Sequence, residues 1–524
     1  MLAADSLPND PIELKQLIVT LQSRHQEQES KYQEQLQNYQ QENELLRELV
    51  RLLKHKYFAK KSEQLRSDQL GLFNEAEALV QPAEEKKIEI KSYRRGQPKR
   101  KPIPEHLPRE EVIIELPADQ RQCPQGHELT EIGEEASEQL DIVPAKLKVI
   151  RTIRKKYACK ACAGHVRLAP RPVTAIPKSM AGPGLLAFII TSKYVDHLPL
   201  YRLENVFARS KLEIPRITMA RWMIQCGQLL QPLVNLLEED LISRGYVQGD
   251  ETRVQVLKEA GKRASSLSYM WVRAREGPEA IILFDYAPSR SGEVPKKLLA
   301  GFKGYLQVDG YEGYNTVCAE PDVTRVGCWA HVRRKFFEAY KASKKGQGKA
   351  AEALGLIKAL YEIEAEAKEY TVAGRYKLRQ QEATPLLAKI RAYLDQYLET
   401  VPPQALLGKA LHYADKQWST LIRYIEDGRL SIDNNFVENA IRPFALGRKN
   451  WLFSDTVAGA EASAILYSLI ETAKANGHEP YDYMRYVLTE LPRTETAEEI
   501  AALLPYKIDP KTISSDPLEH NPAA

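Results

Sequence analysis

The sequence predicts a multi-domain α/β protein. Its 524 residues exceed the size of one ordinary domain, and 43% hydrophobic with 27% charged residues is typical of globular protein. The hydrophobic period also changes along the chain: a heptad pattern comes first, strand-like runs occupy the middle, and long helical patterns dominate the second half. These changes indicate several structural units joined in series.

Composition excludes several classes of protein. The N-terminus lacks the basic lead and apolar core of a signal peptide, and no run approaches the roughly 20 apolar residues of a membrane span. Six cysteines are too few for a disulfide scaffold in so long a chain. We therefore expect a cytoplasmic protein without a membrane partner. Because the net charge is only +4, contact with nucleic acid must depend on local basic clusters.

The segment 11–56 is predicted to form a leucine-zipper-like coiled coil. A heptad can be written from Leu14 to Leu53 with no Gly or Pro between them. The middle of its seam is polar, so a solvated single helix is the alternative to a modest two-stranded coil. The heptad predicts a homo-oligomer formed through this helix.

Residues 57–110 are predicted to be a flexible basic linker. The stretch is charged, contains proline and has no hydrophobic period, and six Lys or Arg residues lie from Lys91 to Lys101. The linker is either a solvated tether or an arm that lies along DNA phosphates.

Residues 111–170 are predicted to form a small zinc-finger-like domain. The runs EEVIIELP, near residue 112, and KLKVIRTIRKKYAC, from residue 146, read as short strands around a candidate metal site. Cys159 and Cys162 form a Cys-x-x-Cys pair, which lets two thiolates bind one tetrahedral Zn²⁺. Cys123 and His127 would complete a Cys₃His site, and a degenerate finger that folds without metal is the alternative. The dispersed cysteines are expected to be small core residues: Cys226, Cys318 and Cys328.

Residues 177–240 are predicted to be a helical, helix-turn-helix-like DNA-binding region. An amphipathic helix is expected near Leu200 to Arg209, followed by a short turn through Ile214 and Pro215 and a second helix with Thr218 near its start. Helix pairs with this spacing also pack on each other without binding DNA, which is the alternative interpretation.

Residues 241–455 are predicted to form an α/β core with a helical insertion at about 340–425. Four runs read as strands, with a helix near Glu293 to Ala300 between the last two: YVQGDETRVQVL, SYMWVRAR, EAIILFDY and GYLQVDGY. The following sequence is rich in Ala, Glu, Lys and Leu, which favours helices. Residues 456–510 are expected to form a small helical C-terminal domain.

Three acidic residues are candidates for one metal site. Asp250 and Asp309 each end a predicted strand, and Glu438 lies on a predicted helix. Three carboxylates gathered at one sheet edge repel one another unless a cation is present, and hard oxygen ligands suit Mg²⁺ or Mn²⁺. Each aspartate alone could be a turn residue, and Glu438 could simply pair with Arg442 one helical turn later. Asp433 is expected to cap the helix, and Glu251 should face away from Asp250 because side chains alternate along a strand.

Basic and aromatic side chains near these acids are candidates for DNA contact. The run CWAHVRRKFFEAY places three of them on one helical face, where they could bind phosphate, although a plain basic helix is the alternative. The run GRKNWLF adds a basic pair beside a ring that could stack on a base. The candidate DNA contacts are His331, Arg334, Lys335, Arg442, Arg448, Lys449 and Trp451.

These motifs together resemble the insertion-sequence-66 family of DDE transposases. The resemblance is carried by GDETRV, VDGYEGYN, CWAHVRRKF and DNNFVENAIRPFALGRKNWLFS. Two upstream runs extend it over nearly the whole chain: KPIPEHLPREEVIIELP and EQLDIVPAKLKVIRTIRKKYAC. The resemblance implies a ribonuclease H-like catalytic core in which Asp250, Asp309 and Glu438 are the catalytic acids and the Mg²⁺ ligands. It also implies a second Cys-x-x-Cys pair, where this chain has Gly126 in place of a cysteine.

The same resemblance implies a function. Such a transposase binds double-stranded DNA at the element ends and at the target, cleaves it with a divalent metal and joins the strands. Accessory proteins encoded by the same element are further expected partners. The alternatives are a non-catalytic zinc-containing DNA-binding protein and a nuclease on the same core that cleaves without joining.

Overall fold

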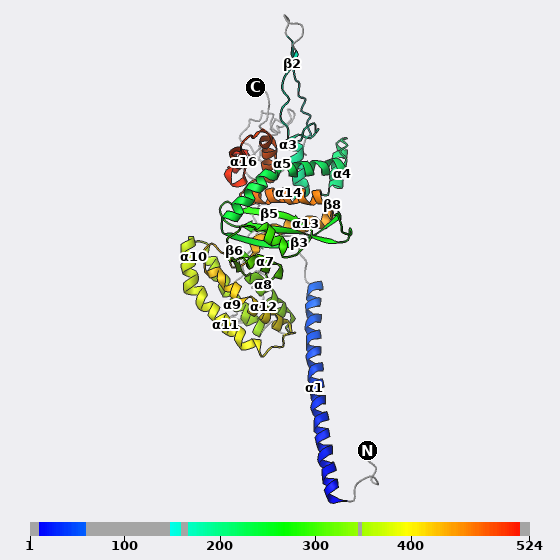
Figure 1. Ribbon diagram of the computed structural model, residues 1–524, viewed down its shortest axis with the longest axis vertical. Coiled ribbons are helices and arrows are strands. Elements are labelled where there is room, and N and C mark those ends of the chain that lie inside the picture. Colours follow the sequence, from blue (N-terminus) through cyan, green and yellow to red (C-terminus); the bar gives the residue numbers. More distant parts are fainter. Residues whose placement is uncertain (1–9, 59–146, 159–165, 344–347, 514–524) are drawn as a thin grey trace, which may run out of the picture. The chain divides into compact units, whose positions relative to one another are not determined.

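The structure is a computed structural model that describes residues 10–58, 147–158, 166–343 and 348–513 (Figure 1). The chain divides into two compact units. Residues 82–172 form one, and residues 1–81 together with 173–524 form the other. None of the described helices combines the length and the apolar composition needed to cross a lipid bilayer.

The N-terminal helix α1 spans Pro11–Phe58, which confirms the helix expected from the heptad. Asp10 caps it, because its carboxylate accepts the backbone N–H of Ile12 at 3.1 Å. Apolar seam residues remain open to solvent, with Leu21 43% exposed and Leu46 52% exposed. Pairing of this helix with a second copy stays a prediction that the exposed seam favours.

The small unit contains one described hairpin. Strands β1 (Lys156–Ala158) and β2 (Val166–Leu168) pair antiparallel, with Tyr157 opposite Arg167. The strand expected from residue 146 onward is therefore shorter than predicted, because residues 147–155 form no regular secondary structure. The strand expected near residue 112 lies outside the described residues.

A six-stranded sheet forms the centre of the larger unit, in the order β5-β4-β3-β6-β7 with β8 paired to β3. The strand bounds are β3 Tyr246–Lys258, β4 Leu267–Arg275, β5 Ile281–Ala287, β6 Gly304–Gln307, β7 Val323–Val326 and β8 Ser454–Thr456. Strands β3, β4 and β5 run antiparallel to one another, whereas β6 and β7 continue parallel to β3. The four predicted strands are confirmed, while β7 and β8 were not predicted.

Helices cover both faces of this sheet. On one face α13 (Asn435–Trp451) packs on β3 and β4, and α14 (Val457–Ala475) packs on β5 (Figure 1). On the opposite face lie α6 (Glu293–Leu298), η3 (Glu312–Tyr314) and α7 (Asn315–Cys318). There the ring of Tyr314 packs edge-on against Trp271, with centroids 5.7 Å apart. The sheet is thus the middle layer of three.

The helices before the sheet join the same hydrophobic core. Their bounds are α3 Pro183–Tyr194, α4 Leu200–Arg209 and α5 Arg216–Ser243. The predicted helix–turn–helix outline is confirmed as a pair of helices, α4 and α5, and its DNA binding stays a prediction. Helix α5 packs closely on α14, because the Cα of Gly227 faces the backbone of Ala462. The last elements are α15 Pro480–Glu490, η6 Leu491–Arg493, α16 Ala497–Ala502, η7 Pro505–Lys507 and α17 Pro510–Ile513.

The predicted helical insertion has a hydrophobic core of its own. Its elements are α8 Trp329–Ala342, α9 Lys349–Ala367, α10 Val372–Leu378, the π-helical turn η4 Arg379–Ala383, α11 Thr384–Leu398, α12 Leu406–Leu421 and η5 Ile422–Ile425. Trp329, Phe336 and Leu360 are among its buried residues. The chain leaves this block through residues 426–434 and enters α13, which carries Glu438.

Candidate active site

Asp250 lies on β3, and Asp309 lies two residues past the end of β6, the neighbouring parallel strand. Gln248 of β3 pairs with Gln307 of β6, and each aspartate follows its glutamine by two residues. Because side chains alternate along a strand, Asp250 is directed to the same sheet face as Gln248. Asp250 was predicted to end its strand. Strand β3 instead continues past it, pairing with β4 as far as Gln255 and with β8 at Val256 and Lys258. Only its parallel pairing with β6 ends near this level.

The two glutamines fix the start of helix α13 on this face. Gln248 accepts the backbone N–H of Val437 at 3.2 Å through its side-chain oxygen, and it donates to the carbonyl of Asp433 at 3.2 Å. Gln307 donates to the carbonyl of Ser431 at 2.7 Å. Both glutamine side chains are fully buried, so the loss of one of these hydrogen bonds would leave a buried polar group unpaired, at the full desolvation cost of that group. The sheet thereby holds the segment that delivers Glu438.

Sequence reasoning missed these glutamines, although a signal was present. Both segments carry the pattern Gln-x-Asp, in VQGD and LQVD, and in each the residue before the glutamine is apolar. A buried amide in an apolar strand needs a partner, so its repetition in two strands indicates a shared polar layer beneath the aspartates.

Glu438 lies in the first turn of α13 and faces helix α8. Its Oε2 atom accepts from Arg334 Nη2 at 3.1 Å, and its Oε1 atom lies 3.4 Å from His331 Nδ1. The pairing with Arg442 that local spacing suggests is replaced by this long-range pairing with Arg334. Burial lowers the pKa of His331, and the neighbouring Glu438 carboxylate partly opposes that shift.

Electrostatics indicate that the three predicted acids share one region. Burial raises the pKa of Asp250 well above its ordinary value, and the negative charges of Glu251, Glu438 and Asp309 raise it further. The described hydrogen bond of its carboxylate is the one from the N–H of Glu251, at 2.9 Å. A half-buried carboxylate with acidic neighbours and so few donors is a typical ligand for a cation.

Asp433 and Glu251 play supporting parts. Asp433 accepts the N–H of Asn435 at 3.1 Å and the hydroxyl of Tyr361 at 2.7 Å, so it stabilises the start of α13, although the helix begins one residue later than a cap at Asp433 would place it. Burial raises the pKa of Asp433 to about 6. Glu251 faces the opposite side of the sheet, as predicted, where it pairs with Arg290 and accepts from Tyr314 at 2.8 Å.

The predicted DNA contacts lie in different surroundings. Arg334 and Lys335 are on α8, and the Lys335 ammonium lies 4.5 Å from the ring centre of Tyr413. Arg448 donates to the hydroxyl of Thr252 at 3.2 Å, and Lys449 is exposed. These groups provide positive charge on the elements that carry the acids. Arg442 is half-buried on the same helix as Glu438.

Trp451 is more enclosed than a free stacking platform would be. Its ring packs edge-on against Phe444, with centroids 5.4 Å apart. A Cβ atom on Gly447 would lie 2.9 Å from Trp451 Nε1, 2.9 Å from the hydroxyl of Tyr467 and 3.0 Å from His197 Nδ1. The helix can approach these three polar atoms only because residue 447 has no side chain. Stacking of Trp451 on a base stays a prediction.

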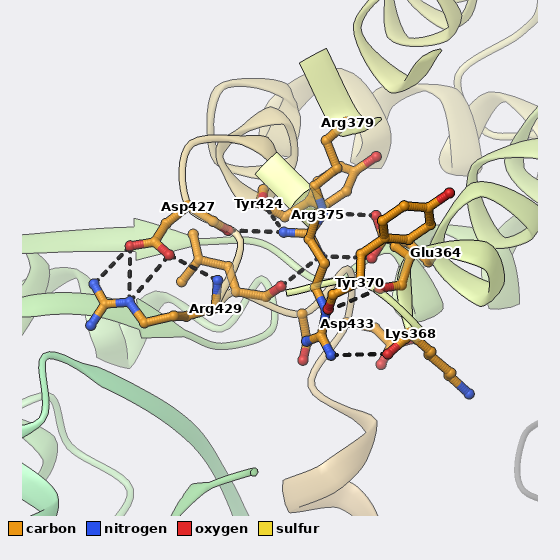
Figure 2. Close-up of polar contacts among 12 residues, drawn as sticks. Glu364, Lys368, Tyr370, Arg375, Arg379, Tyr424, Asp427, Arg429 and Asp433 are labelled. Atoms are coloured by element: carbon orange, nitrogen blue, oxygen red, sulfur yellow. Dashed lines mark hydrogen bonds and ion pairs between the residues drawn. The ribbon is translucent and has the colours of Figure 1, made fainter. Parts of the chain in front are cut away.

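A buried arginine in the helical insertion anchors the segment that precedes Glu438 (Figure 2). The Arg379 guanidinium forms a two-pronged pair with Glu364, at 2.9 and 2.6 Å. It also donates to the carbonyls of Tyr424, Asp427 and Leu430, at 2.8–2.9 Å. All five N–H donors of Arg379 are therefore used, and the insertion holds the chain just before it reaches the acids.

The predicted zinc ligands lie outside the described residues. Cys123 and His127 fall in the range 59–146, and Cys159 and Cys162 fall in 159–165. The Cys₃His site therefore stays a prediction.

Sequence models of one protein family match most of the chain in consecutive pieces. The model described as "Transposase IS66 family" matches residues 178–462, and the "IS66 C-terminal element" matches 468–506. The "zinc-finger binding domain of transposase IS66" matches residues 120–163. The model "Transposase C of IS166 homeodomain" matches residues 45–112.

Curated relatives of the chain come from Sinorhizobium fredii. The uncharacterized protein y4jD is 35% identical over 417 residues, which cover 77% of this chain and 81% of that protein. The uncharacterized protein y4qI is 35% identical over 437 residues, which cover 79% of each chain. The uncharacterized protein y4hP is 31% identical over 446 residues, covering 80% of this chain and 78% of that protein.

Proposed function

This chain belongs to the IS66 family of transposases, and on that premise we propose that it is the DDE transposase of a bacterial insertion sequence. It binds the ends of the element and the target DNA, cleaves phosphodiester bonds and transfers the freed strands. Asp250, Asp309 and Glu438 are its catalytic acids. The observation that carries this proposal is the buried Gln248–Gln307 layer, which ties the start of α13, the helix of Glu438, to the strands that lead to Asp250 and Asp309.

The fold supports the same proposal. The order β5-β4-β3-β6-β7, with three antiparallel strands followed by two parallel ones, is the arrangement expected of a ribonuclease H-like core. In that core the two aspartates come from adjacent central strands and the glutamate from a later helix. The insertion between β7 and α13 occupies the chain between the second aspartate and the glutamate.

The donor set fits a hard divalent cation. Asp250, Asp309 and Glu438 would offer only carboxylate oxygens to the metal, which suits Mg²⁺ or Mn²⁺. When bound, such ions polarise the phosphate and stabilise charge on the attacking and leaving oxygens. The surrounding residues would position the acids. The Gln248–Gln307 layer holds the start of α13 against strands β3 and β6, and Arg334 orients the Glu438 carboxylate through Oε2.

The basic residues around the acids would hold DNA. Arg334 and Lys335 lie on α8, which faces Glu438, and Arg448 and Lys449 lie at the end of α13, so both helices would place positive charge where DNA phosphates bind. Upstream, residues 111–170 with a Cys₃His zinc site and residues 177–240 would contact the element ends. Residues 11–56 would join two copies through the exposed seam of α1.

One assay separates this proposal from its rivals. Purified protein is incubated with labelled element-end DNA, a target plasmid and Mg²⁺, and wild type is compared with Asp309→Asn. Wild type should yield joined products, and Asp309→Asn should yield none while it still binds the DNA. The matched control is Asp322→Asn, because Asp322 is an exposed partner of Lys303 and should leave joining unchanged.

The other outcomes identify the rivals. Cleavage without joining, abolished by Asp309→Asn, would mean a nuclease on the same core. Binding without cleavage in the wild type would mean a non-catalytic DNA-binding protein. Equal joining by wild type and Asp309→Asn would refute the catalytic assignment itself.

A further inference from the structure

A second cluster of metal-binding side chains lies beside the three acids and includes one of them. Cys328, His331 and Glu438 each offer one donor atom, and these atoms all lie within 4.8 Å of one another. Cys328 is the residue before α8 and His331 is the third residue of that helix. These are the two helix positions that interact in a capping box, so the local sequence Cys-x-x-His supplies two of the three residues of the cluster.

Two atoms of the cluster are buried without a hydrogen-bond partner among the described residues. They are His331 Nδ1 and Glu438 Oε1, which lie 3.4 Å apart but lack hydrogen-bond geometry. Arg334 binds the other oxygen of the carboxylate, so Oε1 is left to face the histidine. Buried polar atoms without partners are rare, and an absent ion is one recognised explanation.

The spacing of these atoms matches a tetrahedral metal. With zinc bonds of about 2.0–2.2 Å to nitrogen and oxygen, two ligands on one ion lie roughly 3.4 Å apart. The 3.4 Å between His331 Nδ1 and Glu438 Oε1 is therefore the separation that a shared ion requires. A thiolate from Cys328 would be the third ligand, and a water molecule can fill the fourth position, as in sites with three protein ligands.

We infer that Cys328, His331 and Glu438 form a second metal site, selective for a thiophilic ion such as Zn²⁺, that shares Glu438 with the carboxylate site. One sulfur, one nitrogen and one oxygen donor make a softer set than three carboxylates, so the two sites prefer different metals. Binding requires the Cys328 thiol to release its proton to solvent. The thiolate and the Glu438 carboxylate then balance the charge of the ion.

Sharing of Glu438 gives the site a regulatory consequence, which rests on the proposed function. A zinc ion held by Cys328 and His331 draws Glu438 away from Asp250 and Asp309. Zinc should therefore inhibit Mg²⁺-dependent cleavage by competing for one ligand rather than for DNA.

Binding itself is tested by spectroscopy, with Co²⁺ as the probe in place of Zn²⁺. The full chain carries Cys159→Ser and Cys162→Ser, so that the predicted zinc finger contributes no Cys-x-x-Cys signal. This background should bind one Co²⁺ with a thiolate charge-transfer band in the near ultraviolet. Adding Cys328→Ser should abolish the band, and adding His331→Gln should weaken binding by about tenfold or more.

The matched control in the same background is Cys226→Ser. Cys226 is a buried, free cysteine on α5, so its substitution should leave the band in place. Circular dichroism verifies that each variant is folded. A band that survives Cys328→Ser, or no thiolate band in the background protein, would overturn the inference and leave Cys328 as a buried residue at the start of α8.

The activity arm separates failure of this site from failure of the proposed function. In the cleavage assay, the zinc concentration needed for half-inhibition should rise by about tenfold or more in Cys328→Ser. If the protein binds Co²⁺ as expected but never cleaves DNA, the metal site stands and the proposed function fails. If zinc inhibits wild type and Cys328→Ser equally, the regulatory consequence is refuted.

Discussion

Substitution of Arg379 tests whether the helical insertion holds the segment that leads to Glu438. Arg379→Met keeps a long side chain but removes five N–H donors and leaves Glu364, whose side chain is only 13% exposed, without its cation. Removing one partner of a buried ion pair costs about 3–5 kcal/mol. The three carbonyls that lose a donor add about 0.5–1.5 kcal/mol each where water cannot replace it. We therefore expect a loss of about 4 kcal/mol or more.

Two measurements locate this loss. Urea unfolding followed by tryptophan fluorescence should show a lower midpoint, because Trp329 and Trp418 lie in the core of the insertion. Hydrogen exchange should accelerate most in residues 422–434, which the Arg379 bonds anchor. A double-mutant cycle with Glu364→Gln should recover part of the loss, because the second substitution removes the unpaired buried charge.

The matched control is Arg391→Met. Arg391 pairs with Asp395 and Asp415, which are 63% and 45% exposed, and such surface pairs contribute about 0–1 kcal/mol. If Arg379→Met costs no more than Arg391→Met, or if exchange at 422–434 is unchanged, the anchoring role of Arg379 is refuted.

Three further predictions concern separate parts of the chain. The pKa of Asp433 is raised to about 6 from 3.8, so the folded state favours the protonated acid. The contribution of Asp433 to stability should therefore fall by about 3 kcal/mol as the pH rises from about 4 to 6. Asp433→Asn should flatten this part of a urea midpoint-versus-pH profile, and an unchanged slope would contradict the assignment. Gly447→Ala places a methyl group among three polar atoms and should lower stability by about 1–3 kcal/mol. Gly355→Ala, in open space on a helix, should raise stability by about 0.5–1 kcal/mol. Thermal unfolding compares the two variants, and equal shifts in the unfolding temperature would refute the packing argument. Leu21→Glu together with Leu46→Glu should dissociate the oligomer formed by α1, as measured by sedimentation equilibrium, and a wild-type chain that is already monomeric would contradict the predicted coil.

The hydrophobic pattern of the sequence predicted those helices and strands whose structure depends mainly on their own residues. Periodicity and breaker residues predicted the heptad helix, the helix pair α4 and α5, the four strands from β3 to β6 and the helical insertion. Strands β7 and β8 were missed because they are only four and three residues long, and their pairing partners, not their own sequence, make them strands. The extent of β3 was predicted, because the run YVQGDETRVQVL has the pattern of one strand, although Asp250 was expected to end it.

The candidate site shows the same division. Asp250, Asp309 and Glu438 could be selected as candidate catalytic acids from their positions in the predicted strands and helix. The partner of Glu438 could not, because Arg334 lies 104 positions away and helical spacing reports only neighbours within a turn. The glutamine layer also depends on contacts between distant segments. In a single sequence, the sign of these contacts is a glutamine that follows an apolar residue in each of two strands.

The place of the insertion also sets the order in which the site can be completed during synthesis. Both aspartates leave the ribosome before α8, and the glutamate follows only after five further helices have been made. A nascent or prematurely released chain that stops within the insertion therefore carries two of the three proposed catalytic acids. Such a fragment cannot cut DNA by the proposed mechanism, so the gene layout itself delays competence until translation is nearly finished.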